Sequence, residues 1–525
     1  MRANPGTFDY DAAIIGGGSG GYAAARTVAG YGLKTVVIEG GEEVGGLCIL
    51  RGCMPTKALL YASEVLHLAG HAEPWGIRAK GVGFDFNQVM ARKNALIKEF
   101  ADYRQQQLEN GKFDFVRGFA RFVDEHTVEV TPVEAGRAIS SAPASTTRSR
   151  RPKRLTARSF VIATGSTIAP SPLPQLDTLN CLNSDSVLKL ERLPRSLVVL
   201  GGGAVAVEFA QFFARFGVQV TLVQRSPHIL HEFDPDAATV LETVFRREGM
   251  KVYTGTKLLD ARWYADIPPR SNGKIKGNRK GSKADRTLKA RSGQESSSAA
   301  VRKEVLFEHE GKITRVQADD ILFALGRIPQ IAGLNLDKIG VQLEFQRIAT
   351  NAQMQTSQPH IYAVGDCTGL HEIVHIAIQQ GEVAGHNIAR PGTMKSLDYR
   401  LLTEVIFTEP QIATVGLSEK LANVKNIPYL VASYPFNDHG KSLIMEARDG
   451  FVKLLADPMN GEILGGCCVG PVGGELIHEI IAAMHKRMTV AELAAMPHYH
   501  PTLAEIWTYP AEELAEQVRL ERKMT

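Results

Sequence analysis

The sequence predicts an α/β fold with two Rossmann-like dinucleotide-binding units. Two observations lead to this prediction: an apolar run enters a glycine-rich turn at residues 16–21, and the same pattern returns at residues 201–206. In each place a helical stretch and a second apolar run follow the turn. This strand–helix–strand order is typical of units that hold a pyrophosphate at the N-terminus of a helix.

The first unit extends from Tyr10 to Glu39. Its expected elements are a strand, a helix and a second strand, at residues 12–15, 22–29 and 35–38. Three glycines provide the tight turn, the close approach to a pyrophosphate and the close helix–strand contact: Gly16, Gly18 and Gly21. Glu39 follows the second strand, where an acidic residue takes a ribose hydroxyl.

The second unit begins with an expected strand at residues 197–200 and closes with one at residues 218–223. The three fingerprint positions are Gly201, Gly203 and Ala206. The ribose position holds Gln224 instead of an acid, and Arg225 follows it. A carboxylate would repel a 2′-phosphate, whereas an arginine can bind one, so we favour NADPH over NADH. A solvated loop arginine is the alternative for Arg225.

The composition limits the class of protein. A chain of 525 residues is long enough for three or four domains with buried cores. Its 44% hydrophobic and 22% charged content is ordinary for a soluble globular protein. No run of about 18 apolar residues occurs, so no membrane span is expected, and MRANPGTFDY lacks the apolar core of a signal peptide. We therefore expect a cytoplasmic protein.

Positive charge is concentrated in two stretches. Residues 148–158 hold six Lys/Arg and no acid, and residues 261–303 hold twelve Lys/Arg against three Asp/Glu. Both stretches are poor in apolar periodicity, so we expect disordered basic insertions at about residues 135–158 and 266–303. Nucleic-acid or membrane binding through these segments is the alternative from another functional class, and nucleic acid is the less favoured partner.

The cysteines suggest redox chemistry. Six cysteines in so long a chain are too few for a secreted disulfide framework. Cys48 and Cys53 are separated by four residues just after the first nucleotide unit, and no nearby ligand pattern completes a zinc site, so no metal is expected. A helix that starts near Cys53, with Lys57 one turn on, should lower the pKa of that thiol. Cys467 and Cys468 are expected to be packing residues of a core strand.

Further motifs complete a family pattern. They are GGLCILRGCMPTK at residues 45–57, FVIATGS at 160–166, ILFALGRIP at 321–329, PHIYAVGDCTG at 359–369, and HYHPTLAE at 498–505. Together with the two fingerprints they resemble the class I pyridine nucleotide-disulfide oxidoreductases, the flavoenzyme family of dihydrolipoyl dehydrogenase, glutathione reductase and mercuric reductase. The resemblance spans nearly the whole chain apart from the basic insertions.

The resemblance implies the domain organisation. It suggests an FAD-binding domain at residues 1–170, an NAD(P)H-binding domain at 171–326, a central segment at 327–398 that completes the FAD site, and a C-terminal α+β dimerisation domain at 399–525. The implied cofactors are FAD and either NADPH or NADH. The implied assembly is a homodimer.

The resemblance also implies roles for individual residues. Cys53 would contact the flavin, and Cys48 would exchange with substrate. Lys57 and Glu208 would form an ion pair beside the flavin. Further cofactor contacts are expected in three turns, at Thr164 and Gly165, at Gly326 and Arg327, and at Asp366, which would hold the ribityl chain. His500, oriented by Glu505, would come from the other subunit and shuttle a proton to the exchanging thiol.

The expected function is that of an FAD-dependent NAD(P)H:disulfide oxidoreductase, in which electrons pass from the nicotinamide through FAD and the Cys48–Cys53 disulfide to a small disulfide substrate, or the reverse. HYHPTLAE is closest to dihydrolipoyl dehydrogenase, whereas Gln224 and Arg225 are closer to NADPH-using members. A glutathione reductase-like activity is one alternative, and Arg26 stands where some glutathione reductases place a substrate-binding cation. A diaphorase or metal-ion reductase is another, although the tail RLERKMT lacks the cysteine pair of mercuric reductases.

Overall fold

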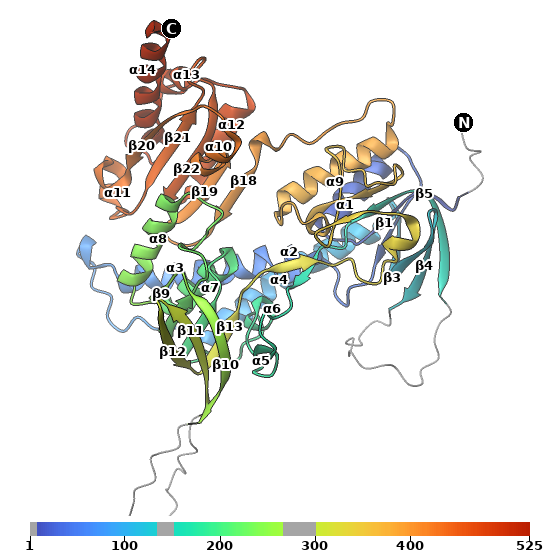
Figure 1. The fold of residues 1–525 in the computed structure, drawn as a ribbon, viewed down its shortest axis with the longest axis horizontal. Helices are drawn as coiled ribbons and strands as arrows, with labels where there is room; N and C mark the ends of the chain where they lie inside the picture. The colour runs from blue at the N-terminus through green and yellow to red at the C-terminus, as the bar shows by residue number, and fades with distance from the viewer. Residues whose placement is uncertain (1–7, 134–151, 266–300, 525) are drawn as a thin grey trace, which may run out of the picture.

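A computed structural model describes residues 8–133, 152–265 and 301–524. The chain folds into three units, each built on β-sheet, which follow one another along the sequence (Figure 1). The first is completed by a late segment that returns to it, and the third contains the C-terminal helix α14 (Thr508–Met524).

The first unit is built on a parallel sheet. Its strands, in spatial order, are β17 (Ile361–Ala363), β5 (Lys153–Ile162), β1 (Tyr10–Ile15), β2 (Thr35–Glu39) and β3 (Asp114–Asp124). Residues 12–15 and 36–38 are buried, which explains their unbroken apolar runs. Beyond the parallel part, β3 and β5 pair in antiparallel fashion with β4 (Thr127–Pro132).

Helices α1 (Ser19–Gly30) and α9 (Val374–Ala389) pack against each other on one face of this sheet (Figure 1). Glycine allows the close approach: a Cβ on Gly381 would lie 2.3 Å from the carbonyl oxygen of Gly20. The small residues of the first fingerprint helix therefore serve both the nucleotide turn and the contact with α9.

The basic insertion expected at residues 135–158 is partly wrong. Residues 153–158 begin strand β5, with Leu155 opposite Val128 and Thr156 opposite Thr127 of β4. Leu155 and Ala157 are buried while Arg154 and Arg158, at the alternate positions, are exposed, so this is a half-buried strand with charges on its outer face. The rest of this insertion, residues 134–151, lies outside the described residues.

The second unit contains a parallel and an antiparallel sheet. The parallel strands are, in spatial order, β13 (Asp320–Phe323), β7 (Ser196–Leu200), β8 (Gln219–Val223) and β9 (Lys251–Tyr253). The antiparallel strands are β10 (Lys257–Ala265), β11 (Val301–His309) and β12 (Lys312–Ala318). The helices of this unit are α5 (Pro174–Asp177), α6 (Ser184–Val187), α7 (Ala204–Arg215) and α8 (Pro235–Arg247).

The second basic insertion separates two paired strands. Residues 301–303, placed in the insertion from the sequence, belong to β11, which pairs with β10. Residues 266–300 lie outside the described residues, so their expected disorder stays a prediction. The same holds for nucleic-acid or membrane binding through either basic insertion.

Two short strands connect the first and second units. Strand β6 (Ser166–Ile168), where the chain leaves the first unit, pairs in antiparallel fashion with β14 (Arg327–Pro329), where the chain returns. The returning segment contains η2 (Leu336–Ile339), β15 (Leu343–Glu344), β16 (Arg347–Ile348) and η3 (Gly365–Thr368). This pairing brings residues 166 and 327, far apart in the sequence, to one place beside the first sheet.

The third unit is an antiparallel sheet covered by helices. Its strands, in spatial order, are β18 (Thr403–Ile406), β19 (Gln411–Gly416), β22 (Ile463–Gly470), β21 (Phe451–Ala456) and β20 (Leu430–Pro435). Its other elements are η4 (Tyr399–Leu401), α10 (Glu419–Lys425), η5 (Phe436–Asp438), α11 (Gly440–Ile444), α12 (Gly473–His485), α13 (Val490–Ala495) and η6 (Ala504–Trp507). Cys467 and Cys468 are buried in β22, as expected for packing residues.

Three further helices follow the first nucleotide unit: α2 (Gly46–Leu50), α3 (Cys53–Gly70) and α4 (Phe86–Glu109), with a single turn, η1 (Glu73–Trp75), between the last two. The Asp85 side chain caps α4 by accepting hydrogen bonds from the N–H groups of Asn87 and Gln88. Within the described ranges, no helix is long and apolar enough to cross a membrane.

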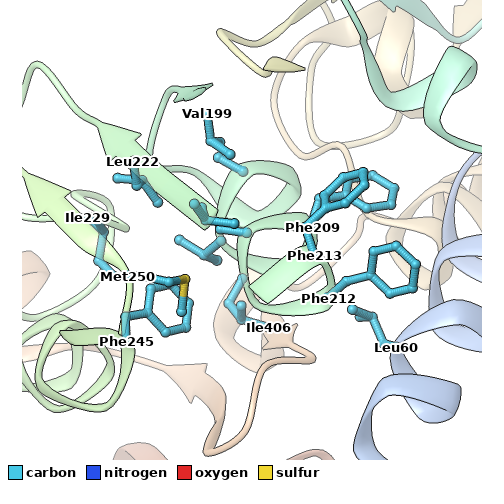
Figure 2. Packing of buried hydrophobic residues seen from close by; sticks show 14 of the residues in the cluster. Leu60, Val199, Phe209, Phe212, Phe213, Leu222, Ile229, Phe245, Met250 and Ile406 are labelled. Atoms are coloured by element: carbon cyan, nitrogen blue, oxygen red, sulfur yellow. The ribbon is translucent and has the colours of Figure 1, made fainter. Parts of the chain in front are cut away.

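One hydrophobic cluster joins the three units near α3. Figure 2 shows Phe209, Phe212 and Phe213 of α7 with Leu60 of α3 and Ile406 of β18. These large apolar side chains fix α3 against α7 by burial. The cluster therefore holds two polar residues in a set position: Lys57, one turn before Leu60, and Glu208, directly before Phe209.

Candidate active site

The first glycine-rich turn has the geometry of a pyrophosphate cradle. Gly16 has φ +106°, and a Cβ there would lie 2.3 Å from the carbonyl oxygen of Ala163. A Cβ on Gly21 would lie 1.9 Å from the carbonyl oxygen of Gly16. Around Gly18 the nearest atom is Gly46 Cα, at 3.7 Å. Packing therefore requires glycine at Gly16 and Gly21, whereas Gly18 leaves the start of α1 open to an anion.

Glu39 and Thr164 lie beside this turn. The Glu39 carboxylate accepts hydrogen bonds from the N–H of Gly17 (2.7 Å) and of Gly41 (2.6 Å), so its position at the end of β2 is fixed. A carboxylate with two such bonds keeps lone pairs for a ribose hydroxyl. Thr164 Oγ1 is buried without a hydrogen-bond partner among the described residues, and Gly165 follows it with φ +74°.

Asp366, Ser166 and Arg327 form one polar group at the β6–β14 pairing. Ser166 Oγ donates to Asp366 Oδ2 (2.7 Å), and Arg327 Nε donates to Ser166 Oγ (2.8 Å). Arg327 Nη2 also donates to the Ser166 carbonyl oxygen (2.9 Å), and Gly326 before it has φ +116°. Asp366 and Arg327 come from different expected cofactor turns, and Ser166, which the sequence did not single out, connects them.

The second glycine-rich turn repeats the first. Gly201 has φ +113°, and a Cβ there would lie 2.3 Å from the carbonyl oxygen of Ala324. No atom of the described residues lies within 4 Å of a Cβ built on Gly203, and Ala206 is fully buried in α7. This turn matches the first one at two positions, the crowded Gly201 and the open Gly203, whereas its third position accommodates the Cβ of Ala206.

Gln224 and Arg225 differ in their surroundings. Gln224 is buried, packs against Gly202 and accepts a hydrogen bond from the N–H of Arg225 (3.0 Å). The Arg225 side chain is exposed and has no hydrogen bond or ion pair with any residue that the structure describes. It is therefore free to bind an anion or to remain solvated.

The two cysteines meet at the junction of α2 and α3. Cys48 lies in α2, and Cys53 is the first residue of α3, after Gly52 at the cap position. Both are partly buried free thiols. The pKa of Cys53 is lowered to about 7, chiefly by the hydrogen bond from the Cys48 thiol. Burial opposes this effect, and the positive charge of Lys57 adds to it. The same hydrogen bond, followed by burial, raises the pKa of Cys48 well above its ordinary value.

Lys57 and Glu208 form an ion pair between α3 and α7. Lys57 Nζ lies 2.9 Å from both carboxylate oxygens of Glu208, whose side chain is only 4% exposed. Glu208 Oε1 also accepts a hydrogen bond from the N–H of Phe407 (3.0 Å), and Lys57 Nζ lies 4.4 Å from the centre of the Phe407 ring. The pair therefore has its orientation set by three segments of the chain.

His500 and Glu505 form a second pair in the C-terminal unit. His500 Nδ1 lies 2.9 Å from Glu505 Oε2 and 3.2 Å from Oε1. The His500 side chain is 79% exposed, while Glu505 is 10% exposed. His500 thus presents its other ring nitrogen outward from a fixed carboxylate. His498 is occupied separately, with Nε2 2.6 Å from Glu479 Oε1.

The comparisons with known proteins match this arrangement. Residues 10–381 match the family model described as pyridine nucleotide-disulphide oxidoreductase, and residues 402–511 match the dimerisation domain of the same family. The chain belongs to the pyridine nucleotide-disulphide oxidoreductase family. The α/β fold with two dinucleotide-binding units and a dimerisation domain is therefore confirmed.

Relatives of this oxidoreductase span its whole length. A dihydrolipoyl dehydrogenase from Thermus scotoductus is 34% identical over 511 residues, which cover 97% of this chain and 98% of the relative. The mitochondrial dihydrolipoyl dehydrogenase of Schizosaccharomyces pombe is 30% identical over 502 residues, which cover 95% and 89%.

Solved structures show the same architecture. LpdA from Mycobacterium tuberculosis is 25% identical, with a TM-score of 0.77, and the match covers 96% of this chain and 99% of LpdA. The HOCl-induced flavoprotein disulfide reductase RclA from Escherichia coli has a TM-score of 0.75 at 22% identity, covering 96% and 99%, a likeness that shows the fold alone.

Membership of the family confirms the expected chemistry at the level of class. The protein is an FAD-dependent oxidoreductase that acts on sulfur groups and uses NAD(H) or NADP(H). The first turn fits the flavin cofactor, because it offers an open helix start, a fixed carboxylate and a buried threonine hydroxyl that has no partner in the described part of the chain. The individual site residues and the domain limits stay predictions.

Three residues near the site have no signal in the sequence motifs. Phe407 contacts both members of the Lys57–Glu208 pair. Arg104 of α4 lies 4.4 Å from the centre of the Tyr22 ring and close enough to Cys48 to oppose the rise in the pKa of that thiol. His439 contacts Glu505. Each approaches from a distant segment, so spacing along the chain does not reveal it.

Proposed function

We propose that this oxidoreductase transfers electrons between NAD(H) or NADP(H) and a lipoyl-type disulfide, as a dihydrolipoyl dehydrogenase does. The observation that carries the proposal is Cys53 at the first residue of α3, beside Cys48 and one turn from Lys57. A helix N-terminus and a nearby cation both favour a thiolate, which is the reactive form of the dithiol. Bound FAD would carry two electrons between the nicotinamide and this cysteine pair, in either direction.

The cysteine pair carries out two exchange steps. In the direction of dihydrolipoamide oxidation, one substrate thiol gives its proton to His500 and its sulfur attacks Cys48 of the Cys48–Cys53 disulfide, so that Cys53 leaves as a thiolate. The second substrate thiol then attacks the mixed disulfide, and Cys48 leaves as a thiol that carries a proton. The substrate has become a disulfide, and the cysteine pair holds its two electrons.

In these steps His500 is the proton acceptor, and it comes from the second subunit of a homodimer. Glu505 orients the His500 ring by its contact with Nδ1, so the other ring nitrogen of the exposed side chain can take part in proton transfer. In Figure 1 the C-terminal unit that contains His500 lies apart from α2, which contains Cys48. A dimerisation domain that contributes a residue to the partner's site resolves this separation.

The choice of a lipoyl substrate is supported by the relatives and by Arg26. Relatives with 34% and 30% identity over nearly the whole chain are dihydrolipoyl dehydrogenases. Arg26, which could hold a peptide carboxylate in a glutathione reductase-like site, is paired with Glu382 of α9. A cation that is already neutralised offers less to a substrate carboxylate.

A glutathione reductase-like activity with NADPH is the second candidate. The free Arg225 side chain beside the buried Gln224 favours it, because no carboxylate at this position would repel a 2′-phosphate. A cytoplasmic location is part of both candidates, since six cysteines in 525 residues fit a reducing compartment better than an oxidising one.

An anaerobic titration with NADH and with NADPH tests the cysteine relay. We expect a long-wavelength thiolate-to-flavin absorbance band after two electrons, and the better reductant identifies the nicotinamide cofactor. Turnover on lipoamide, oxidised glutathione and quinones then separates the substrates. A preference for quinones without the band would replace the proposal by a diaphorase activity.

The variant Cys48→Ser tests the role of the exchanging thiol. We expect it to bind FAD normally and to lose lipoamide turnover by at least about a thousandfold, because a serine hydroxyl forms no mixed disulfide. Cys181→Ser, which changes a partly buried cysteine of the second unit, is the matched control. Full lipoamide activity in Cys48→Ser would refute the relay.

A further inference from the structure

A second histidine lies against the carboxylate that orients His500. His439 Nε2 is 3.3 Å from Glu505 Oε1. His500 Nδ1 approaches the same oxygen at 3.2 Å and makes its shorter contact, 2.9 Å, with Oε2. The approach is less well aligned than a standard hydrogen bond, and Nε2 has no other polar partner among the described residues. Glu505 therefore stands between two imidazoles, of which one is exposed and the other is completely buried.

The surroundings of His439 fix its protonation and its tautomer. Burial lowers the pKa of His439, so the ring is neutral at neutral pH, although the nearby Glu505 opposes this effect. Nδ1 lies 2.7 Å from Ser442 Oγ, a buried hydroxyl with no other hydrogen-bond partner in the described part of the chain. When Ser442 donates to Nδ1, the single proton of the neutral ring must lie on Nε2, facing Glu505.

The other groups around His439 do not compete for this role. From α14, the Tyr509 ring lies edge-on at 6.4 Å, and it stacks on Tyr434 of β20 at 4.0 Å. The Tyr434 hydroxyl is bonded to Asp438. Glu505 of η6 and the more distant His500 are the other titratable groups that act on His439. The neighbouring Lys441 is partly exposed.

We propose that His439 is a positioning residue for the proton transfer at His500: as a neutral Nε2–H donor it holds Oε1 of Glu505 and leaves Oε2 to orient the His500 ring. This inference rests on the proposed role of His500 in disulfide exchange. Without the buried donor, Glu505 keeps its charge but loses the contact that fixes its rotation. The carboxylate charge then acts on His500 alone and favours its protonated form.

The test compares His439→Phe, which removes the donor, with His439→Gln, which returns one near the position of Nε2. In the FAD-loaded dimer we expect His439→Phe to lower kcat with lipoamide roughly tenfold with little change in KM, the effect of one lost hydrogen bond in the transition state. We expect His439→Gln to remain within about threefold of the parent, since an amide N–H replaces the ring N–H.

A substrate-free titration gives the readout that separates positioning from general damage. In the two-electron-reduced dimer, the thiolate-to-flavin band changes with pH. The ionisation that is present in the parent and absent in His500→Gln is assigned to His500. In His439→Phe this ionisation should move to higher pH by roughly half a unit. Ser442→Ala is a milder variant for the case in which His439→Phe does not fold. It removes the hydroxyl that fixes the tautomer of His439, so it should move the His500 ionisation in the same direction.

The matched control is His498→Gln. It removes another buried histidine that contacts a glutamate in the same unit, Glu479, but no contact with Glu505. An unchanged ionisation in both His439→Phe and Ser442→Ala would overturn the proposal, and so would an equal shift in His498→Gln. If the parent enzyme fails to turn over lipoamide, the proposed substrate falls, whereas the band titration still tests His439.

Discussion

At the scale of single residues, two neighbours favour the thiolate of Cys53. The hydrogen bond from Cys48 is the larger cause and the Lys57 charge adds to it, and the pKa of Cys53 is lowered to about 7. In Lys57→Met the cation is lost, so the thiolate of Cys53 should form about one pH unit higher. The measurement is a pH titration of the thiolate-to-flavin band in the reduced dimer.

The control for this titration is Lys338→Met, which removes an exposed lysine of η2 that has no ion pair among the described residues. It should leave the midpoint where the parent has it. If Lys57→Met also leaves the midpoint in place, the cation has no role in activating Cys53, and the hydrogen bond from Cys48 alone sets the thiolate.

The motifs alone predict residues whose partners lie nearby in the sequence or in a repeated turn, whereas the Lys57–Glu208 pair, 151 residues apart, was expected only through the family resemblance. His500 and Glu505 are five residues apart, and the structure brings them to 2.9 Å. His439 meets the same carboxylate from the segment between β20 and β21, and Ser166 meets Asp366 across two hundred residues. The spacing of residues along the sequence contains no information about such contacts, because they depend on how distant strands and loops come together in the fold.

At the scale of elements, the contact between α1 and α9 depends on glycine. A Cβ at Gly381 would lie 2.3 Å from a backbone oxygen, which cannot move aside as a side chain can. We expect Gly381→Ala to push the helices apart and to destabilise the first unit by about 1–3 kcal/mol. The measurement is thermal unfolding of the FAD-loaded protein together with its flavin content.

Gly30→Ala provides the comparison within α1. Among the described residues, no atom lies within 4 Å of a Cβ at Gly30, so the added methyl group meets open space. The loss of chain entropy in the unfolded state should then leave stability unchanged or raise it by up to about 1 kcal/mol. Equal effects of the two substitutions would show that the approach of α9 does not require glycine at position 381.

The strands also show where prediction from sequence fails. The buried parallel strands β1, β2, β7 and β8 have continuous apolar runs, so the sequence places them correctly. The start of β5 was assigned to a basic insertion because its charges hid the alternation of Leu155 and Ala157. A strand with one exposed face has half as many apolar residues to detect, and surface Lys and Arg outweigh them in any compositional measure.

At the scale of the whole molecule, buried charges connect units that the sequence shows only as separate motifs. Lys453 of β21 contacts Asp234 and Asp236 of the second unit at 3.0 and 2.7 Å, and Glu419 at 2.8 Å. Burial alone would lower the pKa of Lys453, but the three carboxylates outweigh it and raise the pKa. No local pattern marks these residues, since a lysine in a strand is usually exposed.

An active site that combines Cys48 of one subunit with His500 of the other leads to a prediction about mixed dimers. Cys48→Ser chains keep His500, and His500→Gln chains keep Cys48, so each homodimer lacks one group at both sites. A heterodimer of the two has one site with both groups and one site with neither, provided that His500 serves the Cys48 of the partner. We therefore expect purified heterodimers, selected by two different affinity tags, to show about half the parental lipoamide turnover, while each homodimer falls by at least about a hundredfold.

If His500 instead served the cysteines of its own chain, every site in the heterodimer would lack one group, and turnover would stay at the level of the homodimers. The same samples can be mixed without exchange of subunits as a control, and they should show no gain. The exposed His500 on a buried Glu505 favours the first result, because an oriented imidazole whose second nitrogen has no partner within the described residues of its own chain is available to another.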